Sequence, residues 1–307
     1  MNDVFSRTQS KRLFAFIASG GTLGALTGPI VTNLLVDNLG LGYLLLISAF
    51  VLASSVPCIN WLIKWENTEF DEGAFANTSH TVKDESLKDG VWDGLMLITK
   101  SPYLIGICLF VALYAVSLTF VMIYQAELIE INYVDPIERT KIFSQIDFAS
   151  TAIALILQLI VTSNLIRWIG FRSTFLLIPL GITVGFVFMA AFPVILVTTV
   201  LTIFRRAGDY AIMKPAREML FSVVSREEKY RSKNFIDTAI LRTGDTSGAW
   251  LLTGAKALGA SASTIPMIGV GLGVAWCSVA YWLGNQYNRL SGEQANNLQG
   301  EEAAQNA

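Results

Sequence analysis

Residues 194–256 read VILVTTVLTIFRRAGDYAIMKPAREMLFSVVSREEKYRSKNFIDTAILRTGDTSGAWLLTGAK, and this stretch decides the fold of the chain. It opens as an apolar segment of bilayer-spanning length and then becomes crowded with charge while keeping a helical pattern. A short basic loop and a second charged span follow. A charge at bilayer depth costs at least about 2.5 to 3.5 kcal/mol on insertion scales, so such charges rarely accumulate by chance. The stretch therefore predicts a charged helical hairpin in a membrane, with the apolar remainder of the chain as its scaffold.

The composition supports this interpretation. The chain has 307 residues, of which 53% are hydrophobic and only 15% are charged, whereas a soluble domain carries about 25% charged residues. The net charge of −2 gives no indication of a nucleic-acid partner. The sequence has one histidine. It shows no cluster with metal-ligand spacing, no phosphate-binding loop and no nucleophile beside a general base. We therefore predict an integral membrane protein with the lipid bilayer as its surroundings, without metal or cofactor, that is not an enzyme.

Eight apolar segments are long enough to cross a bilayer as helices, which takes about 20 residues each. β-Barrel strands would be half as long and would alternate in polarity, so we predict an all-α membrane protein with eight transmembrane helices. The segments are approximately 13–36, 43–63, 103–125, 146–166, 174–192, 194–221, 235–255 and 264–282.

The order of these segments divides the chain into four parts. Residues 1–63 are predicted to form a partial N-terminal bundle of two helices, and residues 64–101, which have mixed charge, a cytoplasmic central loop. Residues 102–288 are predicted to form a six-helix C-terminal bundle, and the polar residues 289–307 a disordered tail.

The distribution of lysine and arginine predicts the orientation. With the N-terminus inside, 14 of the 22 basic residues lie in inside segments, 3 lie in outside segments, and the other 5 lie within spans. Loops on the cytoplasmic side carry an excess of Lys and Arg, so both termini are predicted to be cytoplasmic.

The first span carries a row of small residues. Gly20, Gly24 and Gly28 are four residues apart and share one helix face, and Pro29 follows them. Small residues let another helix approach closely, and proline kinks a helix. The row is interpreted either as a surface for tight helix packing or as a contact surface that moves during transport.

The charged hairpin supplies the candidate substrate-binding residues. Arg205 and Asp209, like Lys214 and Glu218, are four residues apart and can be neighbours on one helix face. Arg205 lies 11 residues past Val194, hence about 16 Å into the membrane at 1.5 Å per residue. The candidates are Arg205, Arg206, Asp209, Tyr210, Lys214, Arg217, Asp237, Arg242 and Asp245.

Two interpretations of these charges remain open. In the first, they are ion pairs that hold helices together or lock one state. In the second, Arg205, Arg206 and Arg242 make bidentate contacts with an anionic solute. The three aspartates would then partner the arginines or carry a proton, and exchange of partners would release the solute.

Several motifs resemble a known family. The GxxxGP pattern of Gly24–Pro29 resembles the fifth-helix motif of the major facilitator superfamily. LIRWIGFR, residues 165–172, resembles a degraded copy of its loop motif, with Arg167 where an Asp is usual. RRAGDYAIMKPARE (205–218), EEKYRSKNFIDT (227–238) and LRTGD (241–245), with SPYLIGICLF (101–110) and QAELI (125–129), resemble the bacterial ADP/ATP antiporter-like nucleotide transporters.

This resemblance implies helices five to twelve of a twelve-helix fold, with the first four lacking. It implies a bacterial inner-membrane transporter that moves a small organic anion by alternating access, with a nucleotide, through ADP/ATP exchange, as one candidate. One alternative is a facilitator-type transporter of another small solute, with the charges as gates. The other is a truncated remnant without transport activity, or a membrane subunit that needs a partner to supply the missing helices.

Overall fold

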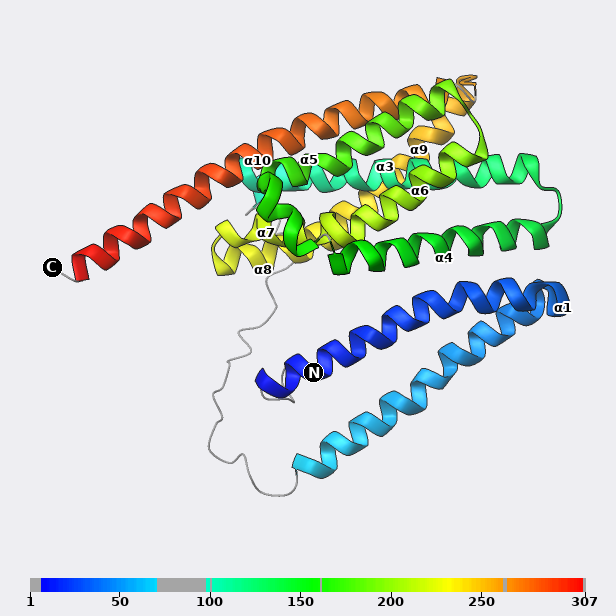
Figure 1. Ribbon diagram of the computed structural model, residues 1–307, viewed down its shortest axis with the longest axis horizontal. Helices are drawn as coiled ribbons and strands as arrows, with labels where there is room; N and C mark the ends of the chain where they lie inside the picture. Colours follow the sequence, from blue (N-terminus) through cyan, green and yellow to red (C-terminus); the bar gives the residue numbers. More distant parts are fainter. Residues whose placement is uncertain (1–6, 71–97, 100, 161, 262–263, 306–307) are drawn as a thin grey trace. The chain divides into compact units, whose positions relative to one another are not determined.

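The computed structural model describes residues 7–70, 98–99, 101–160, 162–261 and 264–305, and every regular element within them is helical. This confirms the all-α prediction for the described part of the chain (Figure 1). The α-helices are α1 (Arg7–Phe70), α3 (Pro102–Asn132), α4 (Pro136–Ile160), α5 (Thr162–Ala191), α6 (Ile195–Gly208), α7 (Lys214–Leu220), α8 (Arg226–Phe235), α9 (Leu241–Ala257) and α10 (Thr264–Gln305). Two π turns, η1 (Asp209–Met213) and η3 (Ile236–Ile240), and a 3₁₀ turn, η2 (Phe221–Val223), lie among them.

Five helical stretches of the described residues are long and apolar enough to cross a membrane. The count of eight is therefore not confirmed as such. The first two predicted spans lie within the single assigned helix α1, and the sixth and seventh are divided by the π turns and carry charge. The five stretches are 20–61, 102–132, 136–158, 170–191 and 264–294.

Helix α1 reverses direction at Gly40, where the chain leaves the helical conformation with φ 72° and ψ 174°. Its two arms run back along each other, as the blue ribbon of Figure 1 shows. A residue with a Cβ rarely adopts a positive φ, so glycine makes this reversal possible. The two arms correspond to the first two predicted spans.

The chain divides into two compact units, and unit 1 comprises residues 1–88 and 133–148. Here the Lys141 ammonium lies 2.5 Å from an Asp37 carboxylate oxygen, and Asn33 donates a 3.3 Å hydrogen bond to the Ser144 hydroxyl. A Cβ added to any of the three small residues of the first span (Gly20, Gly24 and Gly28) would meet nothing within 4 Å in the described structure. Their role in helix packing stays a prediction.

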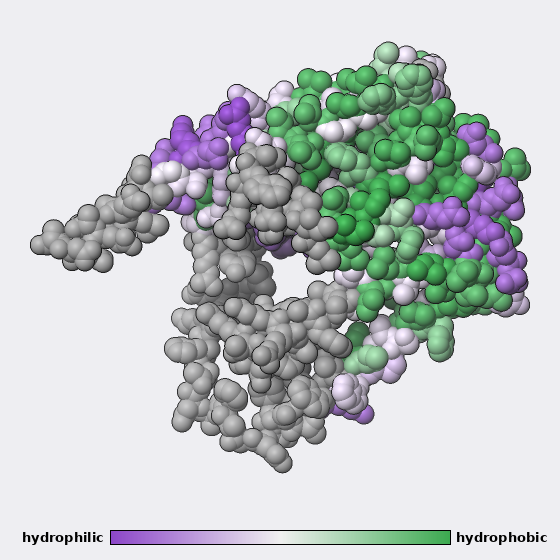
Figure 2. All heavy atoms as spheres, viewed as in Figure 1, coloured by the Kyte–Doolittle hydropathy of each residue, from purple (hydrophilic) through white to green (hydrophobic). Residues whose placement is uncertain are grey.

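Unit 2 comprises residues 89–132 and 149–307, and α3 is central to it because α9, α10 and α6 all pack against α3. Its core is aromatic: the rings of Phe110 and Phe175 stack with centroids 4.3 Å apart, and Trp276 is fully buried beside Phe110. The outward side chains of this unit are also largely apolar, and Figure 2 shows a predominantly green surface there. An apolar surface of this extent is suited to lipid rather than water.

Two glycines bring α9 against α3. A Cβ on Gly244 would lie 2.6 Å from the Cβ of Ala115 and 3.0 Å from the Ala112 carbonyl oxygen. A Cβ on Gly248 would lie 3.0 Å from the Val116 carbonyl oxygen. The two glycines are four residues apart, so α9 presents a small-residue face to α3.

Three boundaries differ from the sequence-based expectation. Helix α1 extends to Phe70, into the predicted loop 64–101, most of which lies outside the described residues. Helix α10 extends to Gln305, so residues 289–305, for which we expected a disordered tail, are helical. They continue an already packed helix, which removes the cost of nucleation, and contain several Ala, Gln and Glu, which are good helix formers. The two units divide at residues 88/89 and 132/133 and within α4 at 148/149, whereas the predicted boundary lies at residue 102, and the two predicted bundles stay a prediction.

Candidate functional site

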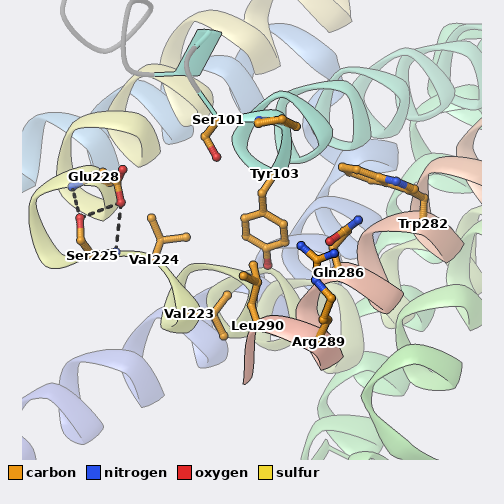
Figure 3. Close-up of a pocket in the computed structure, with 11 residues that line it drawn as sticks. Ser101, Tyr103, Val223, Val224, Ser225, Glu228, Trp282, Gln286, Arg289 and Leu290 are labelled. Carbon is orange, nitrogen blue, oxygen red and sulfur yellow. Dashed lines mark hydrogen bonds between the residues drawn. The ribbon is translucent and has the colours of Figure 1, made fainter. Parts of the chain in front are cut away.

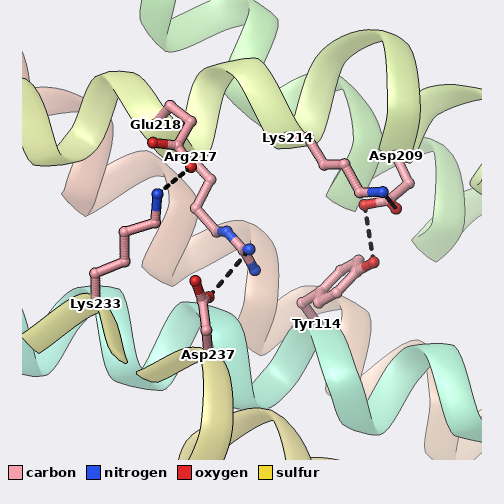
Figure 4. Close-up of polar contacts among 7 residues, drawn as sticks. All are labelled: Tyr114, Asp209, Lys214, Arg217, Glu218, Lys233 and Asp237. Carbon is pink, nitrogen blue, oxygen red and sulfur yellow. Dashed lines mark hydrogen bonds and ion pairs between the residues drawn. The ribbon is translucent and has the colours of Figure 1, made fainter. Parts of the chain in front are cut away.

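Two polar regions interrupt the apolar interior of unit 2. One is a pocket at the start of α3, beside the middle of α10 (Figure 3), and the other is the set of charges on the predicted hairpin, some of which Figure 4 shows. The second, which we call the charged cluster, consists of the nine candidate residues together with Tyr114 and Thr119. It is built by α3, by the run α6–η1–α7, and by the run η3–α9.

The carboxylates Asp209 and Asp237 lie in the two π turns. In η1 the Lys214 amide donates to the Asp209 carbonyl, and in η3 the Leu241 amide donates to the Ile236 carbonyl, five residues back in each case. The turn η1 lies immediately before Pro215, which has no amide to donate to the helix. A π turn inserts one residue, changes which side chains share a face, and is frequent at functional sites.

Asp209 is the most contacted carboxylate of the cluster. Tyr114 donates a 2.8 Å hydrogen bond to its Oδ1, and the Lys214 ammonium lies 3.9 Å from its Oδ2 (Figure 4). The same ammonium lies 3.7 Å from the centre of the Tyr210 ring, within range of a cation–π interaction. The Asp209 side chain is only 15% exposed, so its charge depends on these partners.

Two further ion pairs join α7 to α8 and η3. The Arg217 Nη2 lies 3.1 Å from Asp237 Oδ1. The angles at this contact do not meet those of a hydrogen bond, so it is an ion pair only. Lys233 donates to Glu218 at 2.6 Å (Figure 4). The i,i+4 spacing had suggested Lys214 as the partner of Glu218, and this was wrong because Lys214 lies beside Asp209.

Arg205 is the deepest cation, with 6% of its surface exposed and its Nε without a hydrogen-bond partner among the described atoms. Three residues earlier in α6, the Thr202 hydroxyl donates a 2.8 Å hydrogen bond to Gln125 Oε1 on α3. The Gln125 amide nitrogen, like the Arg205 Nε, has no hydrogen-bond partner among the described atoms. A buried polar group without a partner costs free energy. The contact between α3 and α6 is thus polar, and some of its buried polar atoms have no hydrogen-bond partner among the described atoms.

The α9 side of the cluster holds Asp245 and Arg242. Thr119 on α3 donates a 3.0 Å hydrogen bond to Asp245 Oδ1, and Arg242 is exposed. Arg206 is partly buried, and Tyr210 is 50% exposed. The structure therefore brings the predicted residues onto neighbouring helices of one unit, some buried and some open.

The charged cluster is cationic. It contains three aspartates (Asp209, Asp237 and Asp245) and five basic side chains (Arg205, Arg206, Lys214, Arg217 and Arg242). Glu218 does not offset this excess of positive charge, because it pairs with Lys233. No group of three or more potential metal ligands is found in the part of the chain that the structure describes. The arrangement suits an anion rather than a metal ion.

Sequence reasoning missed the partners that α3 supplies. Tyr114 and Thr119 lie within an apolar span and read as ordinary core and small polar residues. Sequence reasoning also missed Gly244 and Gly248, although their four-residue spacing is a small-residue pattern that marks a face suited to close helix packing.

The described residues form helices with apolar outer surfaces and charges within some of them, which is the architecture of a polytopic membrane protein. A sequence model of the Major Facilitator Superfamily matches residues 1–224, and the chain belongs to that superfamily. The chain is 21% identical to ADP,ATP carrier protein 1 of Chlamydia muridarum, over 92% of this chain and 59% of the relative. It is 20% identical to the protein of the same name from Chlamydia trachomatis, over the same shares.

A chloroplast protein is also similar: ADP,ATP carrier protein 2 of Arabidopsis thaliana is 23% identical, over 67% of this chain and 37% of the relative. No solved structure matches the chain. The resemblance to nucleotide transporters is thereby confirmed. The chain spans about 59% of the length of the chlamydial relatives that it matches.

Proposed function

We propose that the chain moves a small organic anion across the membrane by alternating access, and that a nucleotide, exchanged as ADP for ATP, is its first candidate solute. The observation that carries the proposal is the excess of cations in the charged cluster of unit 2. The names of the relatives support the choice of a nucleotide, at 20 to 23% identity.

Arg206 and Arg242 would bind the solute directly. A guanidinium offers two parallel N–H groups that match a phosphate or carboxylate. Lys214, on the Tyr210 ring, would add a compact positive charge. In a site of low dielectric constant each such contact is stronger than in water.

Asp209 would compete with the solute for the same cations. Lys214 lies 3.9 Å from Asp209, a distance at which the ion pair is weak enough to be opened. A bound anion would draw Lys214 away, and release would restore the pair to Asp209, which Tyr114 keeps in place. Exchange of partners in this way is a means of coupling binding to a change of state.

We also propose that the chain crosses the membrane eight times, with both termini in the cytoplasm of a bacterium. The two arms of α1 would be the first two crossings. The run α6–η1–α7 (195–220) would be the sixth crossing and the run α8–η3–α9 (226–257) the seventh. The charged cluster would then lie within the bilayer, where ionisable residues are functional by default.

The ion pairs favour a second candidate, a facilitator-type transporter of another small solute in which the charges act as gates. The ion pairs Arg217–Asp237 and Lys233–Glu218 join α7 to η3 and to α8. As gates, these pairs would hold the segments together in one state and separate in the other.

Exchange of labelled ATP against internal ADP in proteoliposomes separates these candidates. The chain is assayed alone and joined to the first four helices of a relative. Exchange by either form supports the proposal, and exchange by the joined form only identifies a partner-dependent subunit. If neither form exchanges nucleotide while both elute as folded protein, the nucleotide assignment fails and other anions are tested as solutes.

A further inference from the structure

The pocket in Figure 3 lies in unit 2, at the end of α3 where that helix begins. It has a volume of about 380 Å³, which is within the range of small-molecule sites. Tyr103 forms its wall: the ring is 8% exposed and the hydroxyl donates a 2.9 Å hydrogen bond to the Leu220 carbonyl. This wall is fixed by packing and a hydrogen bond, so the pocket is preformed.

One cation and one carboxylate line the pocket from different helices. Arg289 of α10 lies with its Nε 3.6 Å from Glu293, and both side chains are more than 60% exposed, so this ion pair is weak. Glu228 of α8 uses its Oε2 to accept from the Ser225 amide and hydroxyl in a capping box. The guanidinium Nη atoms and the second carboxylate oxygen have no hydrogen bond in the described contacts.

An apolar groove adjoins the polar pocket. It has a volume of about 400 Å³ and is lined by Ile105, Leu109 and Val279, with Ile105 and Leu109 nearly half exposed on the outer surface. Pro102 and Trp282 line both the pocket and the groove, so the two sites are adjacent.

Gly106 makes room for the side chain that joins the two sites. A Cβ at this position would lie 2.3 Å from a ring carbon of Trp282. The six-membered ring of the indole therefore packs against α3 at Gly106, and Trp282 borders both the polar pocket and the groove. Tryptophan is enriched at the level of lipid headgroups, because one end of its ring is polar and the rest is apolar.

We infer that this pair of sites binds a phospholipid whose headgroup carries a phosphate and a primary ammonium, as phosphatidylethanolamine does. The phosphate lies at Arg289, the ammonium lies toward Glu228, and an acyl chain follows the groove past Trp282 and Leu109. A free phosphate would leave the groove empty, and a purely anionic headgroup would face the Glu228 carboxylate. The inference does not depend on which solute the charged cluster binds.

The test counts bound lipids by native mass spectrometry. The whole chain is titrated in mild detergent with phosphatidylethanolamine, phosphatidylglycerol and phosphatidylcholine, each with the same acyl chains. One phosphatidylethanolamine is expected to bind more tightly than either other lipid. Arg289→Gln should weaken its binding roughly tenfold or more, since a hydrogen bond to a charged group is lost.

Three further variants make the test specific. Leu109→Trp fills the groove and should weaken all three lipids. Glu228→Gln keeps the capping box, since Gln serves at this position too, but removes the charge, and it should abolish the preference for phosphatidylethanolamine. Glu293→Gln is the matched control: it frees Arg289 without touching the pocket lining, and binding should be equal or tighter.

Several outcomes would overturn the inference. They are equal binding of the three lipids to the unaltered chain, a preference for phosphatidylglycerol, or no effect of Arg289→Gln and Leu109→Trp in variants that elute as folded protein. Displacement of the lipid by soluble glycerophosphoethanolamine would indicate a headgroup site that does not use the groove. A change of oligomeric state in Leu109→Trp without lipid loss would show that a second copy of the chain occupies the groove.

Discussion

Tyr114 donates a 2.8 Å hydrogen bond to Asp209, and this contact joins the apolar helix α3 to the first residue of a π turn. The tyrosine ring lies among core residues of α3, and its centroid is 5.9 Å from that of Trp276. Asp209 is therefore held by a donor packed in the core on one side and by the half-exposed Lys214 on the other. Such a carboxylate can exchange its cation without losing its position.

We expect Tyr114→Phe and Asp209→Ala to be coupled in stability. Each single change removes the hydrogen bond, so the double variant should cost less than the sum of the single ones. Interhelical hydrogen bonds in membranes contribute about 0.6 kcal/mol on average and at most about 1.7 kcal/mol, less than the value for charged groups in water, because the unfolded chain in lipid finds other partners. Unfolding in mixed micelles of increasing SDS content measures the coupling, and purely additive effects would show that the contact does not form in the membrane.

The Arg217–Asp237 pair predicts rescue by charge reversal. Arg217→Asp or Asp237→Arg alone places like charges at the α7–η3 contact, where both groups are partly buried. Each should lower the thermal stability of the purified protein. The double swap should recover part of the loss, since opposite charges then face each other again. If the double swap is as unstable as the worse single variant, the pair does not hold these segments together.

Two glycines of α9 should respond to alanine with opposite signs. Gly244→Ala forces a Cβ to 2.6 Å from Ala115 and should destabilise the protein by about 1 to 3 kcal/mol, as overpacking does. Gly254 is exposed, and a Cβ there would meet nothing within 4 Å. Gly254→Ala should therefore stabilise α9 by roughly 0.5 to 1 kcal/mol through a lower backbone entropy cost. Both shifts are read from thermal unfolding, and equal effects would contradict the close contact of α9 with α3.

The proposed orientation predicts which ends of unit 2 react from which side. In a chain without its three native cysteines, Leu258→Cys, at a position that is 92% exposed, should react with an impermeant maleimide from outside intact cells. Ser222→Cys, in the turn before α8, should react only in inside-out vesicles. The reverse pattern would contradict cytoplasmic termini, and labelling of both from one side would contradict the span count.

The charged hairpin could be predicted because charges in an otherwise apolar chain are conspicuous. The partners could not, because the i,i+4 rule assumes regular α-helix, whereas η1 widens the helix at Asp209. Asp209 meets Lys214, five residues on, across that π turn. Tyr114 and Thr119 gave no signal, since a polar contact between helices depends on tertiary packing. Hydropathy predicted two separate spans in the first part of the chain, and the reversal of α1 at Gly40 agrees with that prediction. The helix beyond residue 289 could not be predicted, because it continues a packed helix into a segment whose composition alone suggested disorder.

The most direct test of the central claim is equilibrium binding of ADP and ATP to the chain in nanodiscs, measured by calorimetry on the unaltered protein, on Arg206→Gln with Arg242→Gln, and on Lys256→Gln. Lys256 is the control, because it is a cation outside the charged cluster that pairs with Glu127. We predict that the double arginine variant loses at least tenfold in affinity, about 1.4 kcal/mol, while its unfolding temperature and the binding of Lys256→Gln stay unchanged. Unaltered nucleotide affinity in the folded double variant would contradict the claim that the charged cluster binds the solute.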